Sequence, residues 1–176
     1  IKPGDTLLIS RKPTGTLLLD NLTLGRNLYL LGTGTGLAPF MSLVKDPAVY
    51  ERFEKVVLVH GCRTAAELAY ADEIENQLPN DELLGEDIRA KLLYYPTVTR
   101  EEFRNRGRIT LLMGNGKMAS DLGLPPVDAA HDRVMICGSQ AMNADCCALL
   151  DARGFAMSPR IGQPGDYVIE RAFVEK

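Results

Sequence analysis

Three alternating glycines follow an apolar run near the start of the chain. Residues 32–39 read Gly-Thr-Gly-Thr-Gly-Leu-Ala-Pro and come directly after residues 28–31. Glycines between a strand and a helix let the backbone approach a phosphate closely, and the helix N–H groups then face the anion. The fingerprint G-x-G-x-x-G would place Leu37 at its third glycine, so this motif is a different one. The pattern predicts either a phosphate-binding loop, which the threonines and Pro39 favour, or a plain strand-helix turn.

Basic residues follow two later apolar runs. After Val59 the chain reads His-Gly-Cys-Arg-Thr over residues 60–64, where NAD-binding proteins place an acid for the ribose 2′-OH. A cation there suits a 2′-phosphate and predicts NADP rather than NAD. Residues 97–100 follow the next run, and further arginines come soon after: Arg104, Arg106 and Arg108. Such a cluster is by itself more typical of a solvated surface, but a loop at the carboxyl end of a strand favours an anion site.

A Cys-Gly-Ser turn at residues 137–139 ends a fourth apolar run. Cys137 also fits the ordinary role of a small buried residue, because no general base stands near it in the sequence. The two histidines, His60 and His131, fit structural roles equally well. The G-x-S-x-G nucleophile motif is absent, and residues 114–117 lack the spacing of a P-loop. The sequence therefore predicts no hydrolytic triad.

The composition matches a globular domain of 176 residues with 45% hydrophobic and 24% charged residues. Because 20 basic and 23 acidic residues leave a net charge of −3, a broad nucleic-acid-binding surface is not expected, and any anion site must be local. The sequence contains no apolar run long enough to span a bilayer, and we expect no signal peptide. Its four cysteines lack metal-ligand spacing, so we expect reduced thiols in a cytoplasmic protein and no metal site.

Four apolar runs alternate with helix-like segments from about residue 26 onward. They are residues 28–31, 55–59, 91–95 and 134–137. Runs that are apolar on both faces are typical of a parallel sheet covered by helices on both sides. We therefore predict a doubly wound parallel α/β domain over residues 26–176. Ligands of such sheets bind at the carboxyl ends of the strands.

Helix signals lie between these runs. Thr64 and Glu67 have the spacing of a capping box, which predicts a helix over residues 64–78. A second helix is predicted over residues 139–153, with Gly154 ending it. Pro39 suits the first turn of a third helix, which would extend to Val44.

Residues 1–25 have a different character. Short β-like runs at residues 7–9 and 16–19 are separated by a turn at residues 12–15. We expect residues 1–25 to be the last strands of an antiparallel β domain. Since the chain starts with Ile1, we also expect it to be a piece of something longer.

Several segments together resemble the C-terminal part of a bacterial ferredoxin- or flavodoxin-NADP reductase. They are residues 32–40, 59–63, 97–100, 107–109, 137–139 and 169–176. The glycine loop recurs across the wider flavoprotein reductase superfamily. The arginines combined with the Ala-Phe-Val-Glu-Lys ending at residues 172–176 are specific to the bacterial reductases.

The resemblance implies a FAD-binding antiparallel β-barrel followed by an NADP-binding α/β domain in an oxidoreductase. We expect the protein to be a monomer. Electrons would pass between NADPH and ferredoxin or flavodoxin, with hydride moving between the nicotinamide and the flavin. The implied cofactor-binding residues are Gly32, Thr33, Gly34, Thr35, Gly36 and Pro39 for the pyrophosphate and nicotinamide, Arg63, Thr99, Arg100 and Arg108 for the 2′-phosphate, Gly138 beside the nicotinamide, and Phe173 against the flavin. The implied catalytic residues are Cys137, Glu170 and Ala172.

Two departures from the family pattern stand out. The R-x-Y-S/T flavin motif is missing, so residues 1–25 would hold only the last barrel strands. Most of the FAD site would then be absent, and the chain alone is expected to be inactive. Gln140 stands where many relatives have proline after Cys-Gly-Ser.

Two other interpretations remain. The chain could be the reductase domain of a flavohaemoglobin, a cytochrome b5 reductase-like protein or an oxygenase reductase, although the ending at residues 172–176 disfavours this. It could also be an NADP-binding module without catalysis. A plain scaffold would leave a glycine loop, several arginines and a Cys-Gly turn at one sheet edge unexplained.

Overall fold

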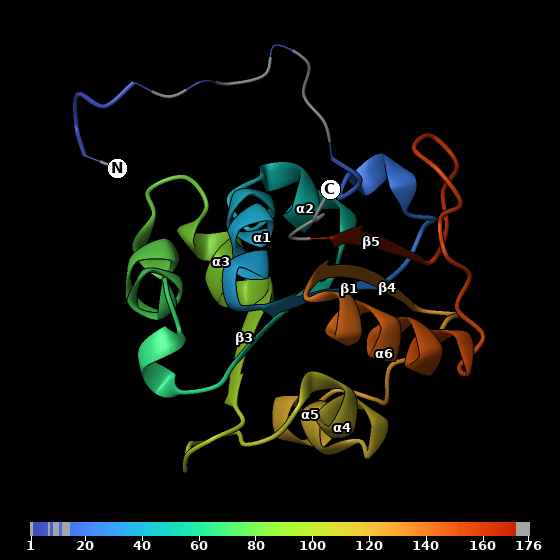
Figure 1. Cartoon of the computed structure of the whole chain (residues 1–176). Coiled ribbons are helices and arrows are strands. Elements are labelled where there is room, and N and C mark those ends of the chain that lie inside the picture. Colours follow the sequence, from blue (N-terminus) through green and yellow to red (C-terminus); the bar gives the residue numbers. More distant parts are fainter. Residues whose placement is uncertain (1, 7, 9–10, 12–14, 172–176) are drawn as a thin grey trace.

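The structure is a computed structural model that describes residues 2–6, 8, 11 and 15–171. Its centre is a five-stranded parallel sheet in the order β3-β2-β1-β4-β5 (Figure 1). The strands are β1 Asn27–Thr33, β2 Lys55–Cys62, β3 Leu92–Val98, β4 Asp132–Gly138 and β5 Tyr167–Arg171. The predicted doubly wound α/β fold is confirmed. The four apolar runs correspond to β1 to β4, whereas β5 was not predicted.

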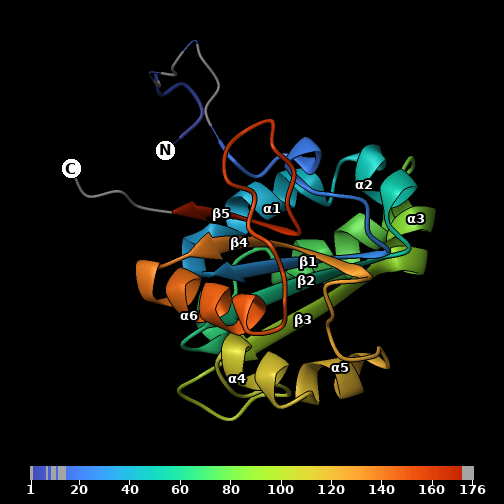
Figure 2. The ribbon, with the colours of Figure 1, turned by 90° about the vertical axis from the view of Figure 1, so that its right-hand side faces the viewer.

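Helices cover both faces of the sheet (Figures 1 and 2). The α-helices are α1 Ala38–Leu43, α2 Pro47–Arg52, α3 Gly85–Lys91, α4 Ile109–Gly114, α5 Lys117–Leu122 and α6 Gln140–Asp151. Shorter 3₁₀ turns are η1 Leu19–Asn21, η2 Gly34–Leu37, η3 Ala65–Glu67 and η5 Leu78–Asn80, and η4 Glu73–Gln77 is a π-helix. None of the helices in the described residues has the length and apolar character needed to cross a bilayer.

Side chains along β1 alternate between two apolar layers. Leu28 and Leu30 pack in the layer that contains residues of α1, α2 and α3. Tyr29 and Leu31 pack in the layer formed with α4, α5 and α6. All four are almost completely buried. Burial on both faces explains why the strand sequence shows a continuous apolar run instead of a polar alternation.

Two of the three predicted helices are confirmed. Pro39 lies in the first turn of α1. The α6 helix begins after Ser139, whose hydroxyl accepts a hydrogen bond from the Met142 N–H at 3.3 Å. After α6, Gly154 adopts a left-handed φ of +81°, a common way to end a helix.

The continuous helix predicted over residues 64–78 is wrong. Residues 65–67 form only the 3₁₀ turn η3, and the next helical segment starts after Tyr70, which has φ +63°. A left-handed residue cannot continue a right-handed helix. The Glu67 carboxylate also does not cap Thr64, because it accepts the backbone N–H of Arg63.

The antiparallel barrel strands expected in residues 1–25 are not confirmed. The described part of this segment contains η1 and one parallel bridge between Leu22 and Gly165, and much of the expected hairpin lies outside the described residues. The Arg52 guanidinium donates to the Leu19 and Leu22 carbonyls, each at 2.6 Å. The end of this segment therefore packs on the α/β domain.

The outer edge of β5 is occupied by other parts of the chain. Tyr167 N–H donates to the Ala156 carbonyl at 3.3 Å, and the Tyr167 carbonyl accepts the Ser158 N–H at 2.9 Å. Further along the strand, the Ile169 carbonyl accepts the Thr16 hydroxyl at 2.7 Å. The loop before β5 and the distant residue Thr16 thus replace a sixth strand at this edge.

Gly36 brings the turn after β1 against the end of β4. A Cβ atom on Gly36 would lie 2.0 Å from the carbonyl oxygen of Cys137. Because the backbone fixes the position of a Cβ atom and the other partner is a backbone carbonyl, no side-chain rotation can relieve this contact. We predict that Gly36→Ala lowers the free energy of unfolding by about 1 to 3 kcal/mol, measured by urea denaturation.

Gly114→Ala is the matched control for this variant. Gly114 is the last residue of α4, and its added Cβ would make an ordinary 3.4 Å contact with Leu149. Alanine is favoured over glycine in a helix by up to about 1 kcal/mol, so this variant should be as stable as the original chain or slightly more stable. Equal stability of the two variants would contradict the close-contact role of Gly36.

Candidate functional site

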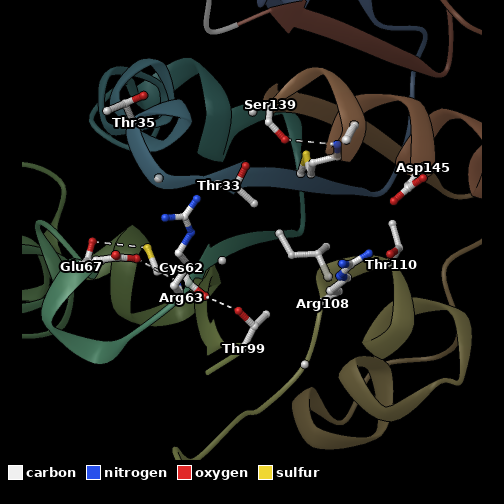
Figure 3. A pocket seen from close by; sticks show the side chains of 17 residues that line it. Thr33, Thr35, Cys62, Arg63, Glu67, Thr99, Arg108, Thr110, Ser139 and Asp145 are labelled. Carbon is white, nitrogen blue, oxygen red and sulfur yellow. Dashed lines mark hydrogen bonds between the residues drawn. The ribbon is translucent and has the colours of Figure 1, made fainter. Parts of the chain in front are cut away.

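A cavity of about 530 Å³ lies at the carboxyl ends of the strands (Figure 3). Its walls come from the ends of β1 and β2, the residues after β3, the end of β4, and the first turns of α4 and α6. The cavity brings together seven of the binding residues implied by the resemblance: Thr33, Gly34, Thr35, Arg63, Thr99, Arg108 and Gly138. Separate stretches of sequence thus converge at one sheet edge.

Other implied binding residues do not line the cavity. Gly32 and Gly36 are buried packing positions: a Cβ atom on Gly32 would lie 3.3 Å from the Phe40 ring. Pro39 lies in the first turn of α1 and does not line the cavity. Phe173, expected against the flavin, and Ala172, expected to be catalytic, lie outside the described residues.

Two arginines, Arg63 and Arg108, face the cavity. Arg63 follows β2, and Arg108 is the residue immediately before α4. Figure 3 shows the Arg63 side chain directed toward the end of β1 that carries Thr33. Within the described part of the chain, neither guanidinium forms an ion pair, whereas Arg104 pairs with Glu75. A guanidinium that no carboxylate pairs with can donate charged hydrogen bonds to an anion, although Glu67 and Asp145 also line the cavity and reduce its net positive charge.

Arg100 contributes to this region through its backbone. Its N–H and that of Thr99 donate to the Arg63 carbonyl at 2.9 and 3.3 Å. The Thr99 hydroxyl donates to the Cys62 carbonyl at 3.4 Å. These bonds join the segment after β3 to the segment after β2. The Arg100 side chain is exposed outside the cavity.

Gly138 allows the ends of β1 and β4 to approach each other. A Cβ atom at this position would lie 2.3 Å from the Thr33 hydroxyl and 2.9 Å from the Met142 sulfur. A larger residue would push Thr33 into the cavity or separate the two strand ends.

Cys137 and Glu170 lie beside each other on the opposite face of the sheet. They are register partners across β4 and β5, and Cys137 belongs to the apolar layer beneath α1 to α3. The Glu170 carboxylate accepts a hydrogen bond from the Thr16 N–H at 2.9 Å and lies 3.3 Å from the Thr16 hydroxyl, which donates to the Ile169 carbonyl. Two of the residues expected to be catalytic are therefore adjacent, but neither lines the cavity.

The Cys137 thiol is not activated. Burial, helped by the negative charge of Glu170, raises its pKa to about 11. The group remains a protonated thiol at neutral pH, and a thiolate nucleophile at this position is not supported.

Both histidines have structural environments. The His60 ring is fully buried, with one nitrogen 3.3 Å from the Tyr94 hydroxyl and the other 3.3 Å from the Cys62 sulfur. Burial lowers the pKa of His60 to about 4, so the ring is neutral near pH 7. His131 lies before β4, at the other end of the sheet, and contacts Asp128. Neither histidine faces the cavity.

Five cavity residues were not identified from the sequence: Glu67, Thr110, Ala141, Met142 and Asp145. Thr110 and Met142 lie in the first turns of α4 and α6. Met142 and Asp145 are three positions apart and so share one side of α6. The three-residue spacing of Met142 and Asp145 after the Cys-Gly-Ser turn was the sequence signal that could have indicated these two residues.

Comparisons with known proteins agree with this geometry. The oxidoreductase NAD-binding domain family matches residues 30–148. The ferredoxin-NADP reductase of Azotobacter vinelandii is 60% identical over 176 residues, covering 100% of this chain and 68% of that protein. The ferredoxin-NADP reductase of Pseudomonas aeruginosa is 58% identical with the same coverage. A solved ferredoxin NADP⁺ reductase from Neisseria gonorrhoeae, with bound FAD and NADP, has a TM-score of 0.78 at 29% identity, covering 91% of this chain and 61% of that one.

His60 makes the stability of the fold depend on pH. Its pKa in the folded state is about 4, below the ordinary value of 6.5, so the unfolded chain binds more protons between these values. The stabilisation is fully present above about pH 6.5 and is lost as the pH falls toward 4. We expect this residue to account for about 3 kcal/mol of the loss in unfolding free energy between pH 7 and pH 4. Urea denaturation of the original chain and of His60→Gln at both pH values measures it, and an unchanged pH dependence in the variant would exclude this role.

Proposed function

Because the chain belongs to the ferredoxin-NADP reductase family of oxidoreductases, we propose that its cavity binds the 2′-phosphorylated adenosine of NADP(H). The protein would transfer electrons between NADPH and ferredoxin or flavodoxin through FAD. The observation that carries the cofactor assignment is the convergence of Arg63, Thr99 and Arg108 on one cavity without a carboxylate paired to either guanidinium in residues 15–171.

The cavity fits this nucleotide in size and chemistry. Its volume of about 530 Å³ is within the usual range for small-molecule sites. Arg63 and Arg108 would contact the 2′-phosphate with charged N–H donors, and Thr99 would add a hydroxyl. Gly34 and Thr35 would face the pyrophosphate, because Gly34 has φ +53° and an open side. We also propose that the Arg100 side chain, which lies outside the cavity in this structure, turns toward the 2′-phosphate.

The nicotinamide end would extend toward Gly138 and the end of β4. Bound NADP(H) and FAD together supply the hydride chemistry, so the protein has to provide orientation and exclusion of water rather than acid-base catalysis. This fits the absence of a histidine on the cavity. The protonated thiol of Cys137 would place an uncharged group next to Gly138 on the opposite face of the sheet, with Glu170 held at a fixed position beside it. The flavin contacts of Ala172 and Phe173 remain proposals.

The relatives favour this function over the alternatives. Both relatives with about 60% identity are named ferredoxin-NADP reductases, which supports this class over a flavohaemoglobin-type, cytochrome b5 reductase-type or oxygenase reductase domain. The chain spans 68% of their lengths. The division into barrel strands at residues 1–25 and an NADP-binding domain at residues 26–176 stays a proposal.

A ferredoxin or flavodoxin partner follows from these names. We also propose that the protein is a monomer in the cytoplasm. The four cysteines are free thiols, three of them buried, as expected for a protein in a reducing compartment.

Removing either cavity arginine should weaken NADP⁺ binding selectively. A hydrogen bond from a charged donor to a phosphate contributes about 1.5 to 3 kcal/mol, which is about 10- to 150-fold in affinity. We expect losses of this size for Arg63→Ala and Arg108→Ala, with NAD⁺ affinity nearly unchanged. Isothermal titration calorimetry with both nucleotides measures the difference.

Arg104→Ala is the control for general charge. Arg104 is in the same arginine-rich segment but pairs with Glu75 and does not line the cavity. Its removal should change NADP⁺ affinity by less than about 3-fold, because exposed charges outside a site are screened. Equal losses for NADP⁺ and NAD⁺ in the cavity variants would exclude the 2′-phosphate assignment.

A further inference from the structure

The segment that carries Arg63 is fastened by two carboxylates. We call residues 62–67 the Arg63 loop. The Glu67 side chain accepts the Arg63 backbone N–H at 2.9 Å, and the Glu101 side chain accepts the Ala65 N–H at 2.5 Å. The Arg63 carbonyl is held from the other side by the N–H of Arg100. Both backbone polar groups of Arg63 are therefore used, although its side chain is exposed.

The Glu67 carboxylate accepts the Arg63 N–H at the point where the sheet ends. Pairing of β2 with β3 stops at Cys62, so Arg63 is the first residue after β2 without a ladder partner. Glu67 closes the loop in two further ways, since its N–H donates to the Thr64 carbonyl at 3.2 Å and its carbonyl accepts the Cys62 thiol at 3.3 Å. Figure 3 shows Glu67, Cys62 and Arg63 together on this wall of the cavity.

A carboxylate on this wall opposes the ligand that the cavity is proposed to take. Glu67 lines the cavity together with Arg63 and Arg108. Like charges a few ångströms apart repel, and a phosphate brought near Glu67 would lose affinity from this term alone. The negative charge of Glu67 is therefore unfavourable for binding a phosphate, unless Glu67 helps binding in another way.

The compensation lies in which group of Arg63 the carboxylate contacts. The contact is with the backbone N–H, and in the described residues Glu67 forms no ion pair with the Arg63 guanidinium. The positive charge of Arg63 therefore remains available to a ligand, while the backbone that directs the side chain is fixed. Ordering a long side chain on binding costs affinity, and a fixed backbone reduces the part of that cost that arises from loop motion.

We propose that Glu67 is a positioning residue that acts through Arg63 and sets the preference of the cavity for a 2′-phosphorylated adenosine. This inference rests on the proposed function. It assigns to Glu67 the orientation of the Arg63 loop, with no contact to the reacting atoms.

The test measures binding of adenosine 2′,5′-bisphosphate and of 5′-AMP to the full chain by isothermal titration calorimetry. Glu67→Ala removes the acceptor for the Arg63 N–H and should weaken binding of the bisphosphate by about 3- to 10-fold, the range for one net hydrogen bond. Binding of 5′-AMP should not change, because it lacks the phosphate that Arg63 would contact. Glu67→Gln keeps an acceptor oxygen without the charge, so it should bind the bisphosphate as well as the original chain or more tightly.

A double variant shows whether Glu67 acts through Arg63. In the Arg63→Ala background, Glu67→Ala should cause no further loss of bisphosphate affinity, because the residue it positions is absent. Glu102→Ala is the matched control: Glu102 is an exposed carboxylate near the same loops that pairs with Arg106 and does not line the cavity. Its removal should leave both affinities within about 2-fold.

Each contrary outcome has a distinct meaning. Equal tightening by Glu67→Ala and Glu67→Gln would show Glu67 to be only an opposing charge and would overturn the inference. Equal weakening of both nucleotides by Glu67→Ala would show a general structural role and would also overturn it. If Arg63→Ala weakens the bisphosphate but Glu67→Ala does not, the inference alone fails. If Arg63→Ala has no effect, the proposed 2′-phosphate site fails and the inference with it.

Discussion

Parallel pairing of β1 with both β2 and β4 is the constraint on which the rest of the structure depends. Because all three strands run in the same direction, their carboxyl ends meet at one edge, and the loops that follow them share one space. The chain moves outward from β1 through β2 to β3 on one side and through β4 to β5 on the other. This reversal separates the loops at the middle of the sheet, which is where ligands of such sheets bind.

Successive residues of a strand point to opposite faces of the sheet, so neighbouring residues at the end of β4 have different environments. Gly138 faces Thr33 and the cavity, whereas its neighbour Cys137 points into the opposite apolar layer beside Glu170. One strand end can thus border the nucleotide with a glycine and place an uncharged thiol on its other side. A shift of one residue in the pairing of β4 would exchange these environments, so the register of the sheet is part of the site.

Much of this arrangement could be predicted from the sequence, because its main signals are local. Strands buried on both faces show as apolar runs, and the order of runs and helix signals predicts a parallel sheet. The edge strand β5 has only five residues and ends in Glu170 and Arg171, so it lacks such a run. The predicted helix over residues 64–78 was wrong because the Glu67 carboxylate is used by a neighbouring backbone group and Tyr70 is left-handed, and neither effect is visible in residue spacing. Spacing also could not show which arginines face the cavity, because that depends on the direction of each loop.

The outer side of β5 has a consequence for how copies of the protein meet one another. An edge strand with free N–H and C=O groups is a template onto which another molecule can add its own strand, and this is a common route to aggregation. Here the outward groups of Tyr167 and the Ile169 carbonyl are already satisfied by Ala156, Ser158 and Thr16. Loop residues thereby cover part of this border of the sheet, which makes it a poorer place for intermolecular β-pairing.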